Sequence, residues 1–184
     1  MKVSVIGAGT MGAGIAQIAA TNGHEVYLFD SFDGAIKNAE TKLNKILNRL
    51  VEKDRISDQE KNDILSRINF SEKLVDISGS GLVIEAIIEN LEIKQKIFTD
   101  IEKLVDNDCI IASNTSSLSI ASISSACEKS ERVIGIHFFN PAPLMPLVEI
   151  IPAVQTSAEI LKNAKSIIDS WRKVTVIAKD TPGF

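Results

Sequence analysis

The sequence has only two cysteines, few aromatic residues and no long apolar run. No hydrophobic segment approaches the roughly 20 residues that a membrane-spanning helix needs. The chain begins directly with a strand-like segment and shows no signal peptide. Its net charge of −4 gives no electrostatic reason to expect nucleic acid or an anionic membrane as a partner. We therefore expect a cytoplasmic protein that binds neither.

The scarcity of cysteine also argues against metal and disulfide chemistry. Cys109 and Cys127 lack the spacing of a metal site, and we predict none. Cys109 opens an apolar segment, which is typical of a small buried side chain, and a disulfide is not expected in a reducing compartment. With 45% apolar and 24% charged residues, the 184-residue chain has the composition of a globular domain.

Segments with the pattern of strands alternate with segments with the pattern of helices. This order is typical of an α/β fold in which right-handed crossovers join parallel strands. Strands are predicted at residues 2–6, 25–29, 82–88, 109–112, 133–139, 147–151 and 174–178. Helices are predicted at 11–21, 91–105 and 119–126, with a further one that Thr156 and Glu159 cap. We expect a doubly wound, mostly parallel sheet.

Residues 34–69 predict a helical hairpin inserted after the second strand. Apolar residues at helical spacing run from Ile36 to Leu50. A second helix is predicted to start at Ser57, because Ser57 and Glu60 have the spacing of a capping box. We expect this helix to extend through Ile68.

A glycine-rich loop, GAGTMG at residues 7–12, joins the first predicted strand to the first predicted helix. Gly7 allows a tight turn, Gly9 lets the backbone approach a pyrophosphate, and Gly12 lets the helix pack closely on the sheet. The helix N-terminus adds free N–H groups and a positive dipole for the phosphates. This context predicts a Rossmann-like dinucleotide site; the alternative is a glycine-rich turn that binds no nucleotide.

Asp30 indicates which dinucleotide the loop would bind. It ends the second predicted strand, 18 residues after Gly12. Its carboxylate can accept hydrogen bonds from the adenosine ribose hydroxyls and would repel a 2′-phosphate. We therefore predict NAD as the cofactor, with Thr10 and Met11 also bordering it.

His137 and Glu149 lie in consecutive apolar segments that a proline-rich turn separates. The fold can thereby bring an imidazole and a carboxylate together, as a general base requires. Taken alone, a histidine such as His137 is more often structural than a base, and Asn140 could serve only the turn. The hydroxyl-rich segment 113–117 could likewise only cap the helix that follows it.

Three segments share a position at the carboxyl end of a predicted strand, where open α/β sheets bind ligands. They are EAIIENL at residues 85–91, ASNTSSL at 112–118 and HFFNPAPLMPLVE at 137–149. With the glycine loop, they closely resemble the short-chain L-3-hydroxyacyl-CoA dehydrogenases, and most of all the bacterial 3-hydroxybutyryl-CoA dehydrogenases, over essentially the whole chain. The resemblance implies NAD-dependent oxidation of an L-3-hydroxyacyl-CoA to the 3-oxoacyl-CoA, or the reverse reaction.

The resemblance also implies roles for individual residues. His137 matches the catalytic base, and Glu149 matches the carboxylate that pairs with it. Ser116 matches a serine that hydrogen-bonds the substrate oxygen, and Asn140 matches an asparagine that positions substrate and histidine. The other matches are Glu89 and Lys94 near the nicotinamide ribose, Asn114 near the nicotinamide and Lys53 at the CoA moiety.

In this chemistry His137 removes the proton of the 3-hydroxyl while a hydride passes to the nicotinamide, and Glu149 stabilises the resulting imidazolium. Two other functions remain open, namely a dehydrogenase of free hydroxy acids and a non-catalytic NAD-binding protein. The helical hairpin on the CoA side argues against the first. The joint presence of His137, Glu149, Ser116 and Asn140 argues against the second.

The sequence differs from the family pattern in two places. Pro146 stands where the family usually has a lysine, so a positive charge near the active-site turn is missing. The family also has an all-helical C-terminal domain that forms a homodimer and closes over the acyl-CoA, whereas the chain ends at Phe184. We expect the chain to be the NAD-binding domain alone, with apolar surface exposed near Phe184 and the last helix. Such a domain should bind NAD with little turnover.

Overall fold

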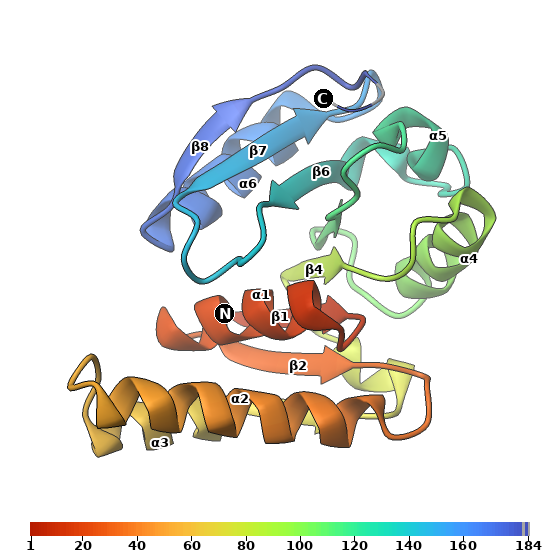
Figure 1. The fold of residues 1–184 in the computed structure, drawn as a ribbon. Coiled ribbons are helices and arrows are strands. Elements are labelled where there is room, and N and C mark those ends of the chain that lie inside the picture. Colours follow the sequence, from red (N-terminus) through yellow and green to blue (C-terminus); the bar gives the residue numbers. More distant parts are fainter. Residues whose placement is uncertain (182, 184) are drawn as a thin grey trace.

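A computed structural model describes residues 1–181 and 183. Within these residues the centre of the fold is one eight-stranded sheet, in the order β3-β2-β1-β4-β5-β6-β7-β8 (Figure 1). The strands are β1 (Lys2–Ile6), β2 (Glu25–Phe29), β3 (Ile68–Ser71), β4 (Leu82–Glu85), β5 (Ile110–Ser113), β6 (Val133–Phe138), β7 (Leu147–Pro152) and β8 (Val174–Ile177). β3 to β6 in this order are parallel, whereas β7 is antiparallel to β6 and β8 is parallel to β7. The predicted mostly parallel sheet is confirmed.

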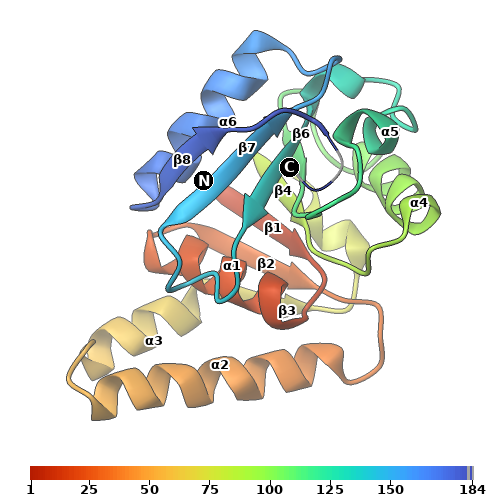
Figure 2. The same ribbon diagram turned by 45° about the horizontal axis from the view of Figure 1, so that its top comes forward.

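Helices cover both faces of this sheet. They are α1 (Thr10–Thr21), α2 (Ala35–Glu52), α3 (Asp58–Ser66), α4 (Leu91–Glu102), α5 (Ile120–Ser124) and α6 (Ala158–Ser170), with short 3-10 helices at Leu74–Ile77 and Ser130–Arg132. Helices α1, α2, α3 and α6 lie on one face, and α4 and α5 lie on the other (Figure 2). The apolar side chains of each group pack in a separate core. Since strand side chains alternate, Val5 belongs to the first core and Ile6 to the second. The fold is doubly wound, as predicted.

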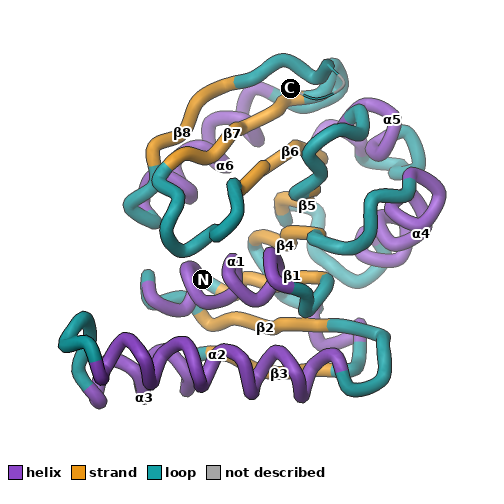
Figure 3. Tube along the Cα trace, in the orientation of Figure 1, coloured by secondary structure: helices purple, strands orange, loops and turns teal. Residues whose placement is uncertain are grey.

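The predicted helical hairpin is formed by α2 and α3, which lie side by side (Figure 3). The capping box is present: the hydroxyl of Ser57 accepts from the N–H of Glu60, and the Glu60 carboxylate accepts from the N–H of Ser57 at 2.7 Å. The prediction that this helix includes Ile68 is wrong. Ile68 instead begins β3, where it pairs with Val26 of β2, because the parallel ladder satisfies its backbone groups.

The N-cap of α6 is Ser157, so the prediction of Thr156 at this position is wrong. The Ser157 hydroxyl accepts from the N–H of Ile160 at 3.2 Å. The Thr156 hydroxyl donates to the carbonyl of Val133 at 2.6 Å and accepts from the N–H of Ala153 at 2.8 Å. Thr156 therefore ties β6 to the turn that follows β7.

Exposed apolar side chains gather on the last strand. Val174 is 61% and Ile177 58% exposed in β8. The sequence placed such a surface near Phe184 and the last helix. Phe184 lies outside the described residues, and within them α6 contributes no large exposed apolar side chain. No helix in the described part of the chain combines the length and the hydropathy needed to traverse a bilayer.

His24 joins the turn before β2 to the end of α6. The indole N–H of Trp171, the only tryptophan of the chain, donates to Nε2 of His24 at 2.9 Å. Trp171 is buried, and His24 is half-buried beside it. Burial, followed by the charge of the N-terminal amino group, lowers the pKa of His24 below its ordinary value of 6.5.

This pair predicts an acid-sensitive contribution to stability. Because the folded-state pKa is lowered, the unfolded chain binds more protons as the pH falls below 6.5. The free energy of unfolding that His24 contributes is therefore complete above this pH and is lost below it. We expect the urea midpoint, followed by Trp171 fluorescence, to fall from about pH 7.5 to about 5.5 more steeply in the parent than in His24→Gln. Equal slopes would show that His24 does not couple folding to pH.

Candidate active site

The glycine loop has three different steric environments. Gly7 has a φ of +103°, in the region that favours glycine. A methyl group on Gly12 would lie 1.7 Å from the carbonyl oxygen of Gly7, so only glycine lets α1 start this close to β1. Around Gly9, in contrast, no other atom lies within 4 Å of a Cβ position. The space beside Gly9, at the N-terminus of α1, is thus open to a ligand phosphate.

Asp30 stabilises this loop through a hydrogen bond and also lines the cavity beside it. One carboxylate oxygen accepts from the N–H of Ala8 at 2.7 Å, and the other accepts from the N–H of Phe32 at 2.9 Å. The sequence predicted contact with a ribose and missed the bond to the loop. A carboxylate oxygen has more than one acceptor site, so both contacts are compatible.

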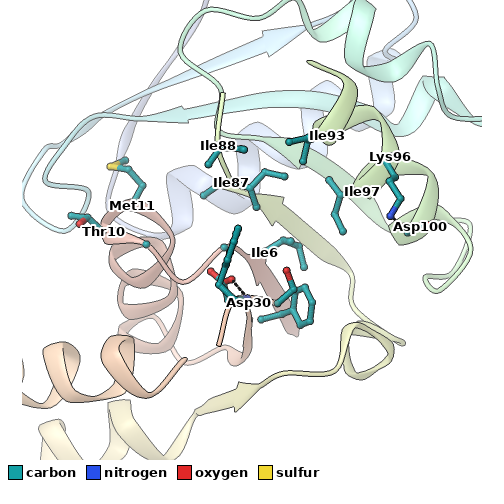
Figure 4. A pocket seen from close by; sticks show the side chains of 16 residues that line it. Ile6, Thr10, Met11, Asp30, Ile87, Ile88, Ile93, Lys96, Ile97 and Asp100 are labelled. Carbon is teal, nitrogen blue, oxygen red and sulfur yellow. Dashed lines mark hydrogen bonds and ion pairs between the residues drawn. The ribbon is translucent and has the colours of Figure 1, made fainter. Parts of the chain in front are cut away.

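A cavity of about 590 Å³ lies between the glycine loop and α4. Thr10, Met11 and Asp30 line one side of it, and isoleucines including Ile87 and Ile97 line the other (Figure 4). An acceptor at one wall and an apolar surface at the other suit a ribose joined to a flat aromatic base. The residues present therefore fit an adenosine group.

His137 and Glu149 face each other across the ladder of β6 and β7. The two residues are direct partners in the antiparallel register. Their side chains therefore share one face of the sheet, and Nδ1 of His137 lies 2.8 Å from Oε2 of Glu149. The side chains are 14% and 15% exposed, so the pair is shielded but accessible.

A second cavity, of about 360 Å³, brings most of the predicted site residues together. It shares Met11 and Ile87 with the first cavity, so the two adjoin. The predicted site residues that line it are Met11, Glu89, Lys94, Asn114, Ser116, His137 and Asn140. Glu149 reaches this cavity through its bond to His137.

Glu89 organises the loop that carries Ser116. Its Oε1 accepts from the hydroxyl of Thr115, from the N–H of Ser116 at 3.0 Å and from the hydroxyl of Ser117 at 3.1 Å. Burial acts to raise the pKa of Glu89, but the bond from Thr115 and the charge of Lys94 outweigh it, and the net effect lowers the pKa. Glu89 is therefore ionised at neutral pH and acts as an acceptor.

Lys94 and Asn114 are held by protein groups at the base of the cavity. Lys94 is 1% exposed, and its ammonium lies 2.6 Å from Glu85 Oε1 and 3.3 Å from Glu89 Oε2. The side-chain oxygen of Asn114 accepts from the N–H of Phe138 at 2.8 Å, which fixes the end of β6. The sequence placed both residues at the cofactor but could not show these internal bonds.

Lys53 lines a third cavity, of about 520 Å³, between the hairpin, α1 and the turn after β6. Lys42 and Arg49 line it too, so three cations border the same space. Asn140 lines both this cavity and the one that contains His137. Lys53 and His137 therefore line different cavities, and Asn140 forms part of the wall of both.

A lysine from another part of the chain contacts the turn that carries Asn140 and Pro146. The ammonium of Lys173 donates to the carbonyls of Ala142 at 2.7 Å and Met145 at 2.8 Å. Desolvation by burial lowers the pKa of Lys173. A positive charge is therefore present at this turn, on a residue that lies between α6 and β8.

The cysteines play no part in these cavities. Cys109 and Cys127 are free and buried, and burial raises the pKa of each thiol to about 12. Among residues 1–181 and 183, no group of three or more His, Cys, Asp and Glu side chains could hold a metal ion.

A glycine loop at a helix N-terminus, an acidic residue after the second strand and a histidine–glutamate pair at the same sheet edge define a dinucleotide-binding domain with an acid–base pair. The family model of the 3-hydroxyacyl-CoA dehydrogenase NAD binding domain matches residues 2–181, and the chain belongs to this family. NAD is therefore the cofactor of this domain.

Relatives with this domain come from bacteria and animals. The chain is 41% identical to 3-hydroxybutyryl-CoA dehydrogenase of Clostridioides difficile, over all of this chain and 66% of the relative. It is 40% identical to the mitochondrial hydroxyacyl-coenzyme A dehydrogenase of Sus scrofa, over 99% of this chain and 60% of the relative. The crystal structure of (S)-3-hydroxybutyryl-CoA dehydrogenase from Ralstonia eutropha superposes with a TM-score of 0.96 at 38% identity, over all of this chain and 65% of that one. The chain thus spans about two thirds or less of these relatives.

The steric difference between Gly9 and Gly12 gives a paired prediction. Gly12→Ala should destabilise the fold by roughly 1–3 kcal/mol, because its methyl group overlaps the Gly7 carbonyl. Gly9→Ala should change stability by less than about 1 kcal/mol but weaken NADH binding at least about tenfold. Urea unfolding and calorimetric titration with NADH measure the two effects. Unchanged affinity in Gly9→Ala would show that the pyrophosphate does not approach this residue.

Proposed function

We propose that the chain is the NAD-binding domain of an L-3-hydroxyacyl-CoA dehydrogenase, and that its short-chain substrates are 3-hydroxybutyryl-CoA and, in reverse, acetoacetyl-CoA. The observation that carries this proposal is the 2.8 Å contact of Glu149 with His137, which lines a cavity adjoining that of the cofactor loop. An acid–base pair beside a dinucleotide site suits the interconversion of an alcohol and a ketone.

In the oxidative direction His137 takes the proton of the 3-hydroxyl group. Nδ1 of His137 carries the proton that it donates to Glu149, so Nε2 is the atom that serves the substrate. Glu149 thereby fixes the tautomer and stabilises the imidazolium. Ser116 and Asn140 hold the oxygen that becomes a carbonyl. NAD, when bound, supplies the hydride acceptor.

The cofactor is held by the glycine loop and by the residues of the two adjoining cavities. Gly9 leaves room for the pyrophosphate at the start of α1, while Gly7 and Gly12 let the loop and the helix pack closely on the neighbouring backbone. Asp30 accepts from the adenosine ribose while keeping its bond to the loop. The nicotinamide end would be held by Glu89, Lys94 and Asn114, which line the cavity of His137 with Met11.

The thioester end of the substrate enters along the third cavity. Lys53, with its neighbours Lys42 and Arg49, offers positive charge to the phosphates of CoA. Asn140 borders both cavities and lies where the acyl group would pass to His137. A likeness at 30% identity to a dehydrogenase of a pyridine carboxylic acid keeps free acids as the second class of substrate to be tested.

We further propose that a helical C-terminal domain in the longer protein completes the substrate cleft and forms a homodimer. The coverage of the relatives supports this division, because matching enzymes extend well beyond the aligned region. The exposed apolar residues of β8 give the domain a surface for further packing.

The 184-residue chain should therefore bind NADH but reduce acetoacetyl-CoA much more slowly than typical enzymes, whose kcat is about 1–1,000 per second. Without the second domain the substrate lacks remote contacts and stays exposed to water. Calorimetry measures the binding, and NADH absorbance measures turnover of acetoacetyl-CoA and, in parallel, free acetoacetate. Turnover within the typical range would contradict the need for a second domain, and a preference for acetoacetate would contradict the CoA substrate.

In a longer protein that contains this domain, His137→Gln should lower kcat by about 100- to 10,000-fold, because general acid–base catalysis is lost. NADH affinity should remain within about threefold, since His137 does not hold the cofactor phosphates. His24→Gln removes the other histidine of the chain and serves as the matched control, with kcat expected to stay unchanged. A kcat that survives in His137→Gln would exclude His137 as the base.

A further inference from the structure

A buried glutamate that the proposed reaction does not use lies directly beneath the site. Glu85 ends β4 and is 0% exposed. Its Oε1 accepts from the N–H of Ile87 at 2.7 Å and from the ammonium of Lys94 at 2.6 Å. Its Oε2 accepts from the hydroxyl of Ser113 at 2.7 Å. Each of these three donors belongs to a segment that borders the candidate active site.

The first connection from Glu85 to the site passes through Lys94. The ammonium of Lys94 lies between two carboxylates, because it also lies 3.3 Å from Oε2 of Glu89. Glu89 uses its other oxygen to accept from the N–H of Ser116 at 3.0 Å and from the hydroxyls on either side of Ser116 in the chain. The charge of Glu85 therefore holds Lys94 in place, and Lys94 in turn holds Glu89, which accepts from Ser116.

The second connection passes through Ser113, at the end of β5. The Ser113 hydroxyl donates to Glu85, and the same oxygen accepts from the N–H of Thr115 at 3.2 Å. The loop is thus fixed at its first residues from β5 and at its centre from Glu89. Both connections end in the segment 115–117, and both begin at Glu85.

A carboxylate in this position needs a reason, since burying a charge is unfavourable unless it is fully paired. An apolar residue could be buried at this position as well, as Val83 and Ile84 are in the same strand. What an apolar residue could not do is hold Lys94 and Ser113 at once. The full set of partners on both oxygens indicates that Glu85 is there to order these neighbours.

We propose that Glu85 is a positioning residue, which sets the place of Ser116 and of Glu89 through Lys94 and Ser113. The catalytic importance of the position of Ser116 rests on the proposed function. The effect of Glu85 on that position is a property of the domain without ligand. Loss of the Glu85 charge leaves Lys94 with Glu89 as its only carboxylate among the described residues, which draws Glu89 toward the ammonium and away from Ser116.

The test compares Glu85→Gln with Glu102→Gln in the 184-residue chain. Glu102 is a matched control, because its carboxylate is also largely buried and accepts from Arg132 and two backbone N–H groups, but at the far end of α4. Hydrogen exchange of the Ser116 N–H, followed by NMR without cofactor, reports the loop. Calorimetric titration with NADH reports the site.

In Glu85→Gln we expect exchange at Ser116 to become about tenfold faster and the Kd of NADH to rise about tenfold, as on losing a charged hydrogen bond. Glu102→Gln should leave both within about twofold, even though it also loses stability. A folded Glu85→Gln with unchanged exchange at Ser116 overturns the proposal. If the parent chain binds no NADH, the proposed function fails, and the exchange rate still decides the role of Glu85.

If Glu85→Gln fails to fold because the buried Lys94 ammonium is left without its nearest carboxylate, a second variant covers this case. Glu85→Gln with Lys94→Gln removes both buried charges and leaves two amides that can bond to each other. The proposal expects this variant to fold and to show the faster exchange at Ser116, since Glu89 has lost its cation. Exchange and affinity equal to those of the parent would mean that Glu85 and Lys94 only stabilise the fold.

Discussion

The alignment of strand ends at one edge of the sheet is the constraint on which the rest of the site depends. β1, β4, β5 and β6 are neighbours and parallel, so their carboxyl ends meet although the chain between them is long. Contacts run along this edge without a break. A Cβ on Gly7 would lie 2.6 Å from the carbonyl oxygen of Ala86. The N–H of Asn114 donates to the carbonyl of Glu85, and the side chain of Asn114 accepts from the N–H of Phe138. The cofactor loop and the end of the histidine strand are thereby parts of one rigid rim.

The reversal of β7 adds what parallel strands alone could not provide. In a parallel sheet His137 could find a partner carboxylate only after a long crossover. The antiparallel return places Glu149 beside it after a short turn, and the ladder of backbone hydrogen bonds sets their distance. The position of the acid–base pair therefore depends on strand pairing. The residues around the pair lie on loops that side-chain hydrogen bonds hold in place. This division explains why a buried carboxylate such as Glu85 is needed under the loop of Ser116 but not under the pair itself.

The sequence predicted the elements whose signals are local. Ser57 and Glu60 marked the start of α3 correctly, because both partners of a capping box lie within one turn. The strand β3 was missed since Ile68 continues the helical spacing, and only the ladder to β2 decides its conformation. The segments predicted at 82–88 and 91–105 end earlier, at Glu85 and Glu102. The glycine loop and the histidine–glutamate pair were found from motifs. The side chains that donate to Glu85 come from α4 and β5, and no local pattern links them to it.

The turn after β6 lies between the cavity of His137 and the cavity of Lys53. Asn140 lines the cavity of His137 and also the cavity of Lys53, so one segment forms a wall of both. Lys173, between α6 and β8, donates to this turn. α1 packs against the same turn, where a methyl group on Gly14 would lie 3.1 Å from the ring of Pro143. The helix that presents its N-terminus to the cofactor thus also carries the wall on which Asn140 rests. A shift of α1 on cofactor binding would therefore reach both cavities, because close-packed contacts transmit displacement between the elements they join.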